Sequence, residues 1–174
     1  YIESSKRTQR RNRDMDYSVK NIKTFYGHDG GCWEASLYNP EGKRVAIVTE
    51  NGWGGELDFH WLNHKHHNNP NVDSVALDKF CKTLPKCKAY DDTLVETDSE
   101  IYLCDLVNDF LTAKEVKKVL KKVAIWFHGK IFTFNIPATE IEWAKPAILK
   151  NHPNAVFLNT LALSEAVKIY KQSA

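Results

Sequence analysis

The sequence lacks the features that mark membrane-spanning, secreted and disulfide-stapled proteins. It has no run of roughly 18 apolar residues and no signal-peptide pattern, so no membrane association is expected. Its four cysteines, Cys32, Cys81, Cys87 and Cys104, include no Cys-x-x-Cys pair. A chain of 174 residues buries enough apolar surface without disulfides. Free thiols in a reducing cytoplasm are therefore predicted, with a Cys81–Cys87 bridge left open as the alternative.

The chain contains a single methionine, and its small net charge is unevenly distributed along the sequence. Met15 is the only methionine, and it immediately precedes the first strand-like run. Residues 1–13 carry five basic and one acidic side chain, so they hold +4 of a total of +2 and leave −2 for the rest. Because residues 1–14 also lack hydrophobic periodicity, they are predicted to be a disordered basic tail, or a segment upstream of a natural start at Met15. Residues 15–174 are predicted to form a single α+β domain.

Four β-prone runs dominate the first third of the chain. They cover residues 17–26, 32–38, 43–49 and 56–62. Glycine-rich turns and an Asn-Pro-Glu-Gly turn separate them at roughly ten-residue spacing, which predicts an antiparallel meander. In the second run Trp33, Ala35 and Leu37 share one face and predict its buried side.

Helices and a second hairpin are predicted to cover this sheet. Residues 71–84 have helical spacing, residues 86–95 are expected to form a loop, and Thr97 to Glu100 has the spacing of a capping box before a helix. A second box at residues 112–115 predicts a separate helix. Further elements follow in order: a hairpin at 124–136, a helix at 140–150, a strand at 155–159 and a helix at 163–172. The fold class is therefore α+β.

Histidines gather at the end of the meander and suggest a metal site. His60, His64 and His66 are the candidate ligands, with His67 and His28 also available. Imidazole suits zinc and other transition metals, although the spacing matches no known ligand pattern. A plain solvated loop is the alternative reading, and a metal-dependent hydrolase or nuclease is the function that a metal would imply.

Two further patterns have stronger structural than catalytic explanations. Asp29 followed by Glu41-Gly42-Lys43 has the acid order of metal-dependent nucleases, but turn chemistry accounts for the Glu-Gly-Lys segment. Cys32 close to His28 has the elements of a thiol nucleophile and base, but one turn does not supply that geometry by default.

The residues that follow position 112 are rich in lysine. Helical spacing would place five of them on one stripe: Lys114, Lys117, Lys118, Lys121 and Lys122. Such a stripe can contact the phosphates of nucleic acid, and a solubilising helix face is the alternative.

Aromatic residues offer a second binding surface. Trp53 lies between glycines at a turn tip, where it can stack on a base or anchor a protein partner. Helices are expected to cover the other tryptophans, including Trp143.

The motifs of the meander carry a resemblance to a known group of proteins. They are an Asn-Ile-Lys strand, Gly-His-Asp-Gly-Gly, Trp-Glu-Ala-Ser-Leu-Tyr, Gly-Lys-Arg-Val-Ala and Asn-Gly-Trp-Gly-Gly, joined by the closing Asn-Ala-Val-Phe-Leu-Asn-Thr-Leu. From Met15 to about Lys171 the chain resembles small uncharacterised proteins encoded by bacteriophages. The resemblance implies an accessory protein in the host cytoplasm and carries no catalytic residues with it.

These patterns fit three functions. The leading hypothesis is a non-enzymatic protein that binds nucleic acid or a host protein through the meander turns or the lysine stripe. The metal-dependent hydrolase is the second, and a sheet that assembles homo-oligomers is the third.

Overall fold

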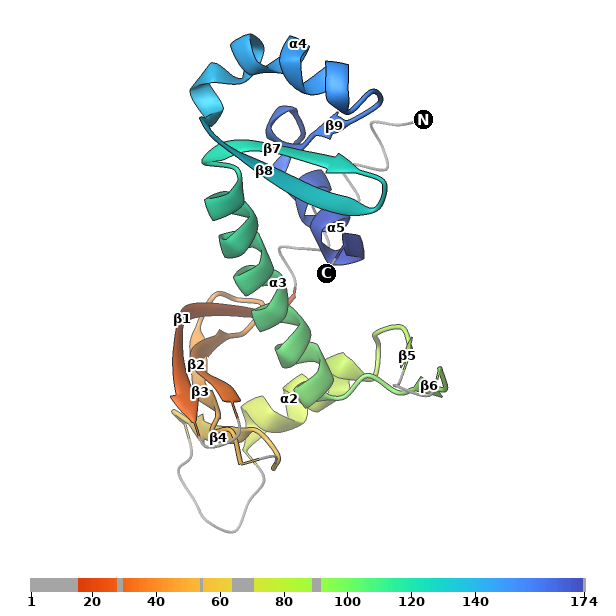
Figure 1. The fold of residues 1–174 in the computed structure, drawn as a ribbon. Helices are drawn as coiled ribbons and strands as arrows, with labels where there is room; N and C mark the ends of the chain where they lie inside the picture. The colour runs from red at the N-terminus through yellow and green to blue at the C-terminus, as the bar shows by residue number, and fades with distance from the viewer. Residues whose placement is uncertain (1–15, 28–29, 54, 64–70, 89–91, 174) are drawn as a thin grey trace. The chain divides into compact units, whose positions relative to one another are not determined.

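The computed structural model of the chain describes residues 16–27, 30–53, 55–63, 71–88 and 92–173 (Figure 1). The predicted basic tail, residues 1–14, lies outside these ranges. The chain divides into two compact units, one ending at Val107 and the other running from Asn108 to Ala174. Whether they fold as the one domain predicted from the sequence stays a prediction.

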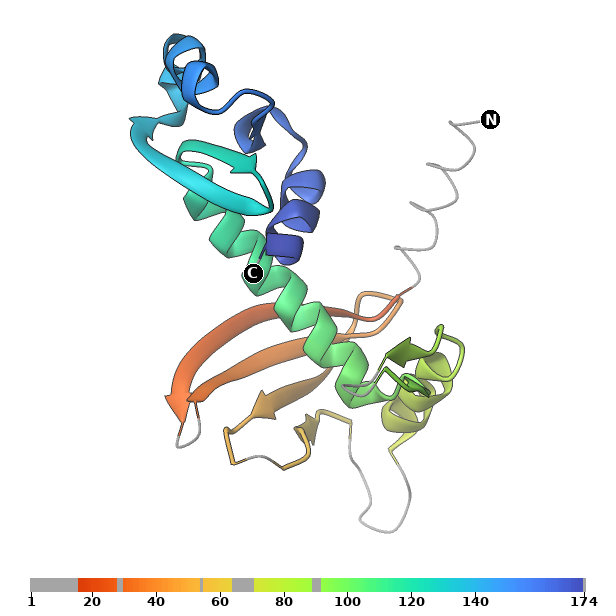
Figure 2. The ribbon, with the colours of Figure 1, turned by 45° about the vertical axis from the view of Figure 1, so that its right-hand side comes forward.

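The first unit is built on a four-stranded antiparallel sheet, as the turn pattern predicts. The strands are β1 Ser18–Gly27, β2 Gly30–Tyr38, β3 Arg44–Glu50 and β4 Asp58–Trp61. They pair in chain order, so each strand hydrogen-bonds its sequence neighbour. Figure 2 shows that β1 and β2 curve along their length. The meander prediction is confirmed.

A bulge in β1 explains why its alternation of apolar and polar residues is imperfect. Lys20 pairs with Ser36 but Lys23 pairs with Glu34, so β1 contains one extra residue between these pairs. Asn21 takes a positive φ of 56° at this point. An inserted residue exchanges the two faces of a strand and breaks its period of two.

The predicted face of β2 is the buried one. Trp33, Ala35 and Leu37 are all buried, and Leu37 is fully enclosed. Their partners on β3 include Val48 and Ala46, which are also fully buried. This continuous apolar surface is the core of the first unit.

Helix α2, Val72–Cys81, begins at Asn71, whose side chain accepts hydrogen bonds from the N–H groups of Asp73 and Ser74. Tyr17, Phe80 and Tyr102 form an aromatic cluster in which neighbouring ring centroids lie 5.3 Å apart. This cluster joins the start of the sheet to α2 and to the next long helix.

That next helix, α3 Ser99–Val119, starts where predicted but with a different cap. Asp98 Oδ1 accepts the hydrogen bond of the Ile101 N–H, at 2.8 Å. Thr97 instead donates to the Pro85 carbonyl, and Glu100 accepts from the Leu57 N–H. The prediction of a capping box at Thr97 and Glu100 is therefore wrong, because both side chains form hydrogen bonds with other segments of the chain.

Two other predictions in this region are also wrong. The capping box at residues 112–115 does not open a new helix, since α3 runs unbroken to Val119. No proline or glycine interrupts it there, and a threonine inside a helix costs only about 0.7 kcal/mol. The loop at 86–95 contains a short hairpin, β5 Cys87–Lys88 paired with β6 Leu94–Val95.

The second unit holds a three-stranded sheet in the order β8-β7-β9. Its elements after α3 are β7 Lys122–Phe127, β8 Lys130–Pro137, the 3-10 turn η1 Ala138–Glu140, α4 Ile141–Asn151, β9 Val156–Phe157, η2 Leu158–Thr160 and α5 Leu163–Ser173. The β7–β8 turn has positive φ at His128 (48°) and Gly129 (77°), as a two-residue type I′ hairpin requires. The predicted hairpin, helices and short strand are confirmed.

Strand β7 is buried on both faces, which gives this unit two clusters of core residues. Val123 and Ile125 pack with Ala144, Ile148 and Phe157. Ala124 packs on the other side, in a cluster with Val116, Leu158 and Ala166. Figure 1 accordingly shows the β7–β8 hairpin between α4 and α5.

All four cysteines are free thiols, so the Cys81–Cys87 bridge is absent. None of the helices within the described ranges is long and apolar enough to cross a membrane.

Candidate nucleic-acid interface

The two compact units carry opposite net charge. Residues 108–174 hold ten lysines against five carboxylates, a net charge of +5. Residues 1–107 hold fourteen basic and seventeen acidic side chains, a net charge of −3, and residues 14–107 alone have a net charge of −7. The modest total charge of the chain therefore hides a basic second unit.

Half of these ten lysines lie between residues 114 and 122, in the arrangement that the end of α3 imposes. Lys114, Lys117 and Lys118 share one face of the helix and are all exposed. The helix ends at Val119, so Lys121 lies in the turn that follows and Lys122 begins β7. The prediction of a single five-lysine helical stripe is wrong, although all five lysines lie within residues 114–122.

One of these lysines has a carboxylate partner. Lys118 Nζ lies 2.7 Å from Glu115 Oε1 on the preceding turn. Among the described residues, no carboxylate lies within ion-pair distance of the other four. Lys117 and Lys118 also occupy the last turn of α3, where positive charge stabilises the helix dipole by about 0.3–1 kcal/mol each.

The segment that joins α3 to β7 is fixed by one side chain, Asn159. Its Nδ2 donates to the carbonyls of Leu120, at 3.0 Å, and Lys122, at 2.9 Å. Its Oδ1 accepts from the N–H of Ala124, at 2.8 Å. This clamp holds the backbone on both sides of Lys121 and Lys122 where β7 and β8 shift register.

Trp53 is exposed, as its place between glycines predicts. The residue is 69% exposed, and its backbone N–H donates to Asn51 Oδ1. The nearby Glu50, Glu56 and Asp58 make this turn acidic, which opposes contact with phosphates.

The histidine hypothesis is only partly covered by the structure. His60 lies on β4 opposite Ile47 and is exposed, whereas His28, His64, His66 and His67 lie outside the described residues. No group of three or more histidines, cysteines and acids within the described ranges is placed to hold a metal ion. A metal site there stays a prediction.

The other catalytic patterns have structural roles where they are described. Gly42 takes a positive φ of 74° in the turn before β3, and the Lys43 N–H donates to Asn39 Oδ1. Cys32 is buried in β2 beside Gly27. A Cβ added to Gly27 would lie 2.3 Å from Cys32 Sγ. Asp29 and His28 lie outside the described residues, so neither pairing is tested.

The thiols of Cys81 and Cys104 are poor nucleophiles. Burial raises the pKa of Cys81 to about 11, and the carboxylates of Asp78 and Asp98 add to the effect. Burial also raises the pKa of the Cys104 thiol. A thiol that stays protonated at neutral pH neither attacks a carbonyl nor binds a metal readily.

A pocket of about 440 Å³ in the second unit was not foreseen from the sequence. Its lining comes from β8 and α4: Phe134, Ile136, Trp143, Ala144, Pro146, Ala147, Ile148, Asn151 and His152. Trp143 was expected to be covered, but it is 76% exposed at the pocket.

No protein-family model, curated protein sequence or solved structure matches this chain. The chain's own charges and surfaces therefore have to support any functional assignment.

Proposed function

We propose that the chain is a non-enzymatic nucleic-acid-binding protein that contacts phosphates through the lysines of its second unit. The observation that supports this most strongly is the net charge of +5 on residues 108–174, with five lysines within positions 114–122. A basic segment on one unit is the electrostatic footprint expected of a phosphate-binding surface.

The arrangement of these lysines suits contact with a backbone rather than recognition of sequence. Three of them project from one helix face, and the Asn159 clamp positions the other two on the adjoining backbone. Lysine is a compact charge on a long, flexible stem, so it meets phosphates without reading base edges. Affinity is then expected to depend steeply on salt and weakly on sequence.

A host protein is the second candidate partner, and a different surface supports it. The first unit is acidic and exposes Tyr26 (95%) and Trp53 (69%). Exposed aromatic residues among carboxylates suit a basic protein surface better than a nucleic acid. The resemblance of the meander to bacteriophage proteins makes an accessory role in the host cytoplasm part of this proposal.

The proposal is tested by fluorescence anisotropy of labelled single- and double-stranded oligonucleotides mixed with the full chain. Replacing Lys114, Lys117 and Lys118 with glutamine removes the charge and keeps a good helix former. We expect affinity to fall by about tenfold or more near 0.1 M salt.

A matched control uses two lysines at the end of a helix in the acidic unit. Lys79 and Lys82 lie at the end of α2 in the acidic unit, and both are exposed. Their replacement with glutamine should leave affinity within about twofold. An equal loss of affinity in both lysine variants, or an unchanged affinity in both, would contradict the proposed surface.

A further inference from the structure

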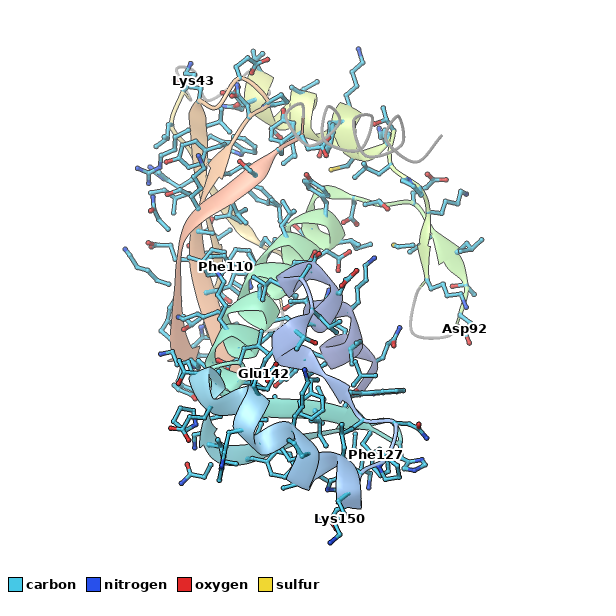
Figure 3. The ribbon with its side chains drawn as sticks, turned by 90° about the horizontal axis from the view of Figure 1, so that it is seen from above. Lys43, Asp92, Phe110, Phe127, Glu142 and Lys150 are labelled. Carbon is cyan, nitrogen blue, oxygen red and sulfur yellow. The ribbon has the colours of Figure 1, made fainter. Side chains whose placement is uncertain are left out.

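The pocket between β8 and α4 combines apolar walls with a polar end. Ala144 and Ile148 form its buried part, and Trp143 stands at its exposed side. Asn151 and His152, at the end of α4, add an amide and an imidazole. Figure 3 marks the direction of this helix, with Glu142 near its start and Lys150 near its end.

His152 is held by aromatic rings on the strands beside it. Its ring centroid lies 5.1 Å from Phe127, 5.7 Å from Phe132 and 6.2 Å from Phe134. Within the part of the chain that the structure describes, its Nδ1 is buried without a hydrogen-bond partner.

The same strand that lines the pocket leads directly to the basic segment. Ile136 lines the pocket, and the next residue, Pro137, pairs with Lys122. The Ala138 N–H donates to the Lys121 carbonyl at 3.0 Å. Lys121 and Lys122 therefore lie beside the end of the strand that lines the pocket, and all five lysines belong to the same compact unit.

The carboxylates near the pocket do not neutralise the positive charge of the lysines. Glu142 Oε1 lies 3.1 Å from Lys145 Nζ one turn later on α4, which offsets its charge. Glu140 lies at the end of η1 and is exposed to solvent, where its field is screened. Lys150 adds a positive charge at the other end of the helix.

We infer that this pocket receives an unpaired nucleobase, which makes single-stranded nucleic acid the ligand of the second unit. The inference rests on the proposed function, since the lysines supply the contact with the backbone. A base has a flat apolar face for Trp143 and the pocket wall, and a polar edge for Asn151 and His152. A volume of about 440 Å³ is large enough for one base. In a duplex the bases are paired and stacked, so they do not reach such a pocket.

The test compares three labelled probes of equal length on the full chain. They are a single-stranded 12-mer of thymidine, the same backbone with abasic sugars, and a duplex. The abasic probe keeps the phosphates and removes only the bases. Because stacking of a base on an aromatic side chain contributes about fivefold to a hundredfold in affinity, the thymidine probe should bind at least fivefold tighter than the abasic probe.

Two substitutions locate the effect in the pocket. Trp143→Ala should bring the thymidine probe down to the abasic level and leave abasic binding unchanged, while Trp143→Phe restores part of the difference. Ala147→Leu fills the pocket and keeps Trp143, so it should also lower the affinity for the thymidine probe. Leu149→Ala, at an exposed apolar residue of the same helix that does not line the pocket, is the control and should change none of the three affinities.

The outcomes separate this inference from the proposal beneath it. Equal binding of thymidine and abasic probes, still lost on lysine replacement, overturns the base pocket and leaves nucleic-acid binding standing. A loss with Trp143→Ala but not with Ala147→Leu also overturns the pocket, since surface stacking alone would explain it. If no probe binds, nucleic-acid binding itself fails.

Discussion

Removal of the Asn159 side chain is the perturbation whose effect follows most directly from the structure. Asn159→Ala deletes three hydrogen bonds, two donated to the carbonyls of Leu120 and Lys122 and one accepted from the Ala124 N–H. Ala124 is fully buried, so its N–H would be left without a partner and without water. An unsatisfied buried group costs about 1–3 kcal/mol, and the two carbonyls add to this. We expect a loss of about 2–4 kcal/mol in the free energy of unfolding.

The measurement is urea-induced unfolding, followed by tryptophan fluorescence and by hydrogen exchange. Exchange of the Ala124 amide should accelerate in Asn159→Ala, while the Leu57 amide of the first unit, bonded to Glu100, keeps its protection. Asn135 on β8 is exposed, so Asn135→Ala is the matched control and should change stability by less than about 0.5 kcal/mol.

Asn159→Asp removes the amide donors but keeps the size of the side chain, so it separates the loss of these hydrogen bonds from the loss of packing. An ionised carboxylate would face two carbonyls that now receive hydrogen bonds, so this variant should be at least as unstable as Asn159→Ala at neutral pH. It should regain stability as the pH falls and the acid acquires a proton to donate. A cost below about 0.5 kcal/mol for Asn159→Ala would refute the clamp.

Three further predictions concern the first unit. Gly27→Ala should destabilise it strongly, because the new Cβ would lie 2.3 Å from Cys32 Sγ, whereas Gly31→Ala meets nothing within 4 Å and should be neutral in a urea melt. Tyr102→Phe removes the hydrogen bond that its hydroxyl donates to a backbone carbonyl at 2.8 Å, so unfolding should require about 1 kcal/mol less, and an unchanged midpoint would contradict this. Burial raises the pKa of Cys81 to about 11, so its alkylation at pH 8 should be far slower than in urea. Because the folded state favours the protonated Cys81 thiol, its contribution to the free energy of unfolding is complete below pH 9 and is lost as the pH rises from about 9 toward 11. A melting temperature that stays constant over that pH range would contradict this prediction.

The elements with a strong local signal were predictable from the sequence. The meander followed from glycine-rich turns at regular spacing, and the β7–β8 hairpin followed from the His128-Gly129 turn. The helical spacing of apolar side chains in residues 71–84 identified α2, and the cap formed by Asn71 appears only in the structure. In each case the residues that decide the structure lie within a few positions of one another.

Errors arose where distant segments decide the outcome. Thr97 and Glu100 have capping-box spacing, but their side chains bond to Pro85 and Leu57 instead. Thr112 has the same local signature and lies inside an unbroken helix. Local preference is a weak prior that tertiary contacts override.

The candidate site shows the same division. The lysines were visible in the sequence, but the end of α3 at Val119 determines which of them share a helix face. The pocket was not visible in the sequence because Phe134 and Ile136 on β8 meet Trp143 on α4 only after the chain turns at η1. No spacing rule connects a strand to the helix that follows an intervening turn.

The most direct test of nucleic-acid binding is the salt dependence of affinity for a single-stranded oligonucleotide. With the full chain, a plot of log affinity against log salt should be linear with a slope of about −3.5 if all five lysines contact phosphates, since each contact on a single strand contributes about −0.7. Replacing Lys121 and Lys122 with glutamine should reduce the magnitude of the slope by about 1.4. A slope near zero, or one that these substitutions leave unchanged, would contradict phosphate binding by this segment.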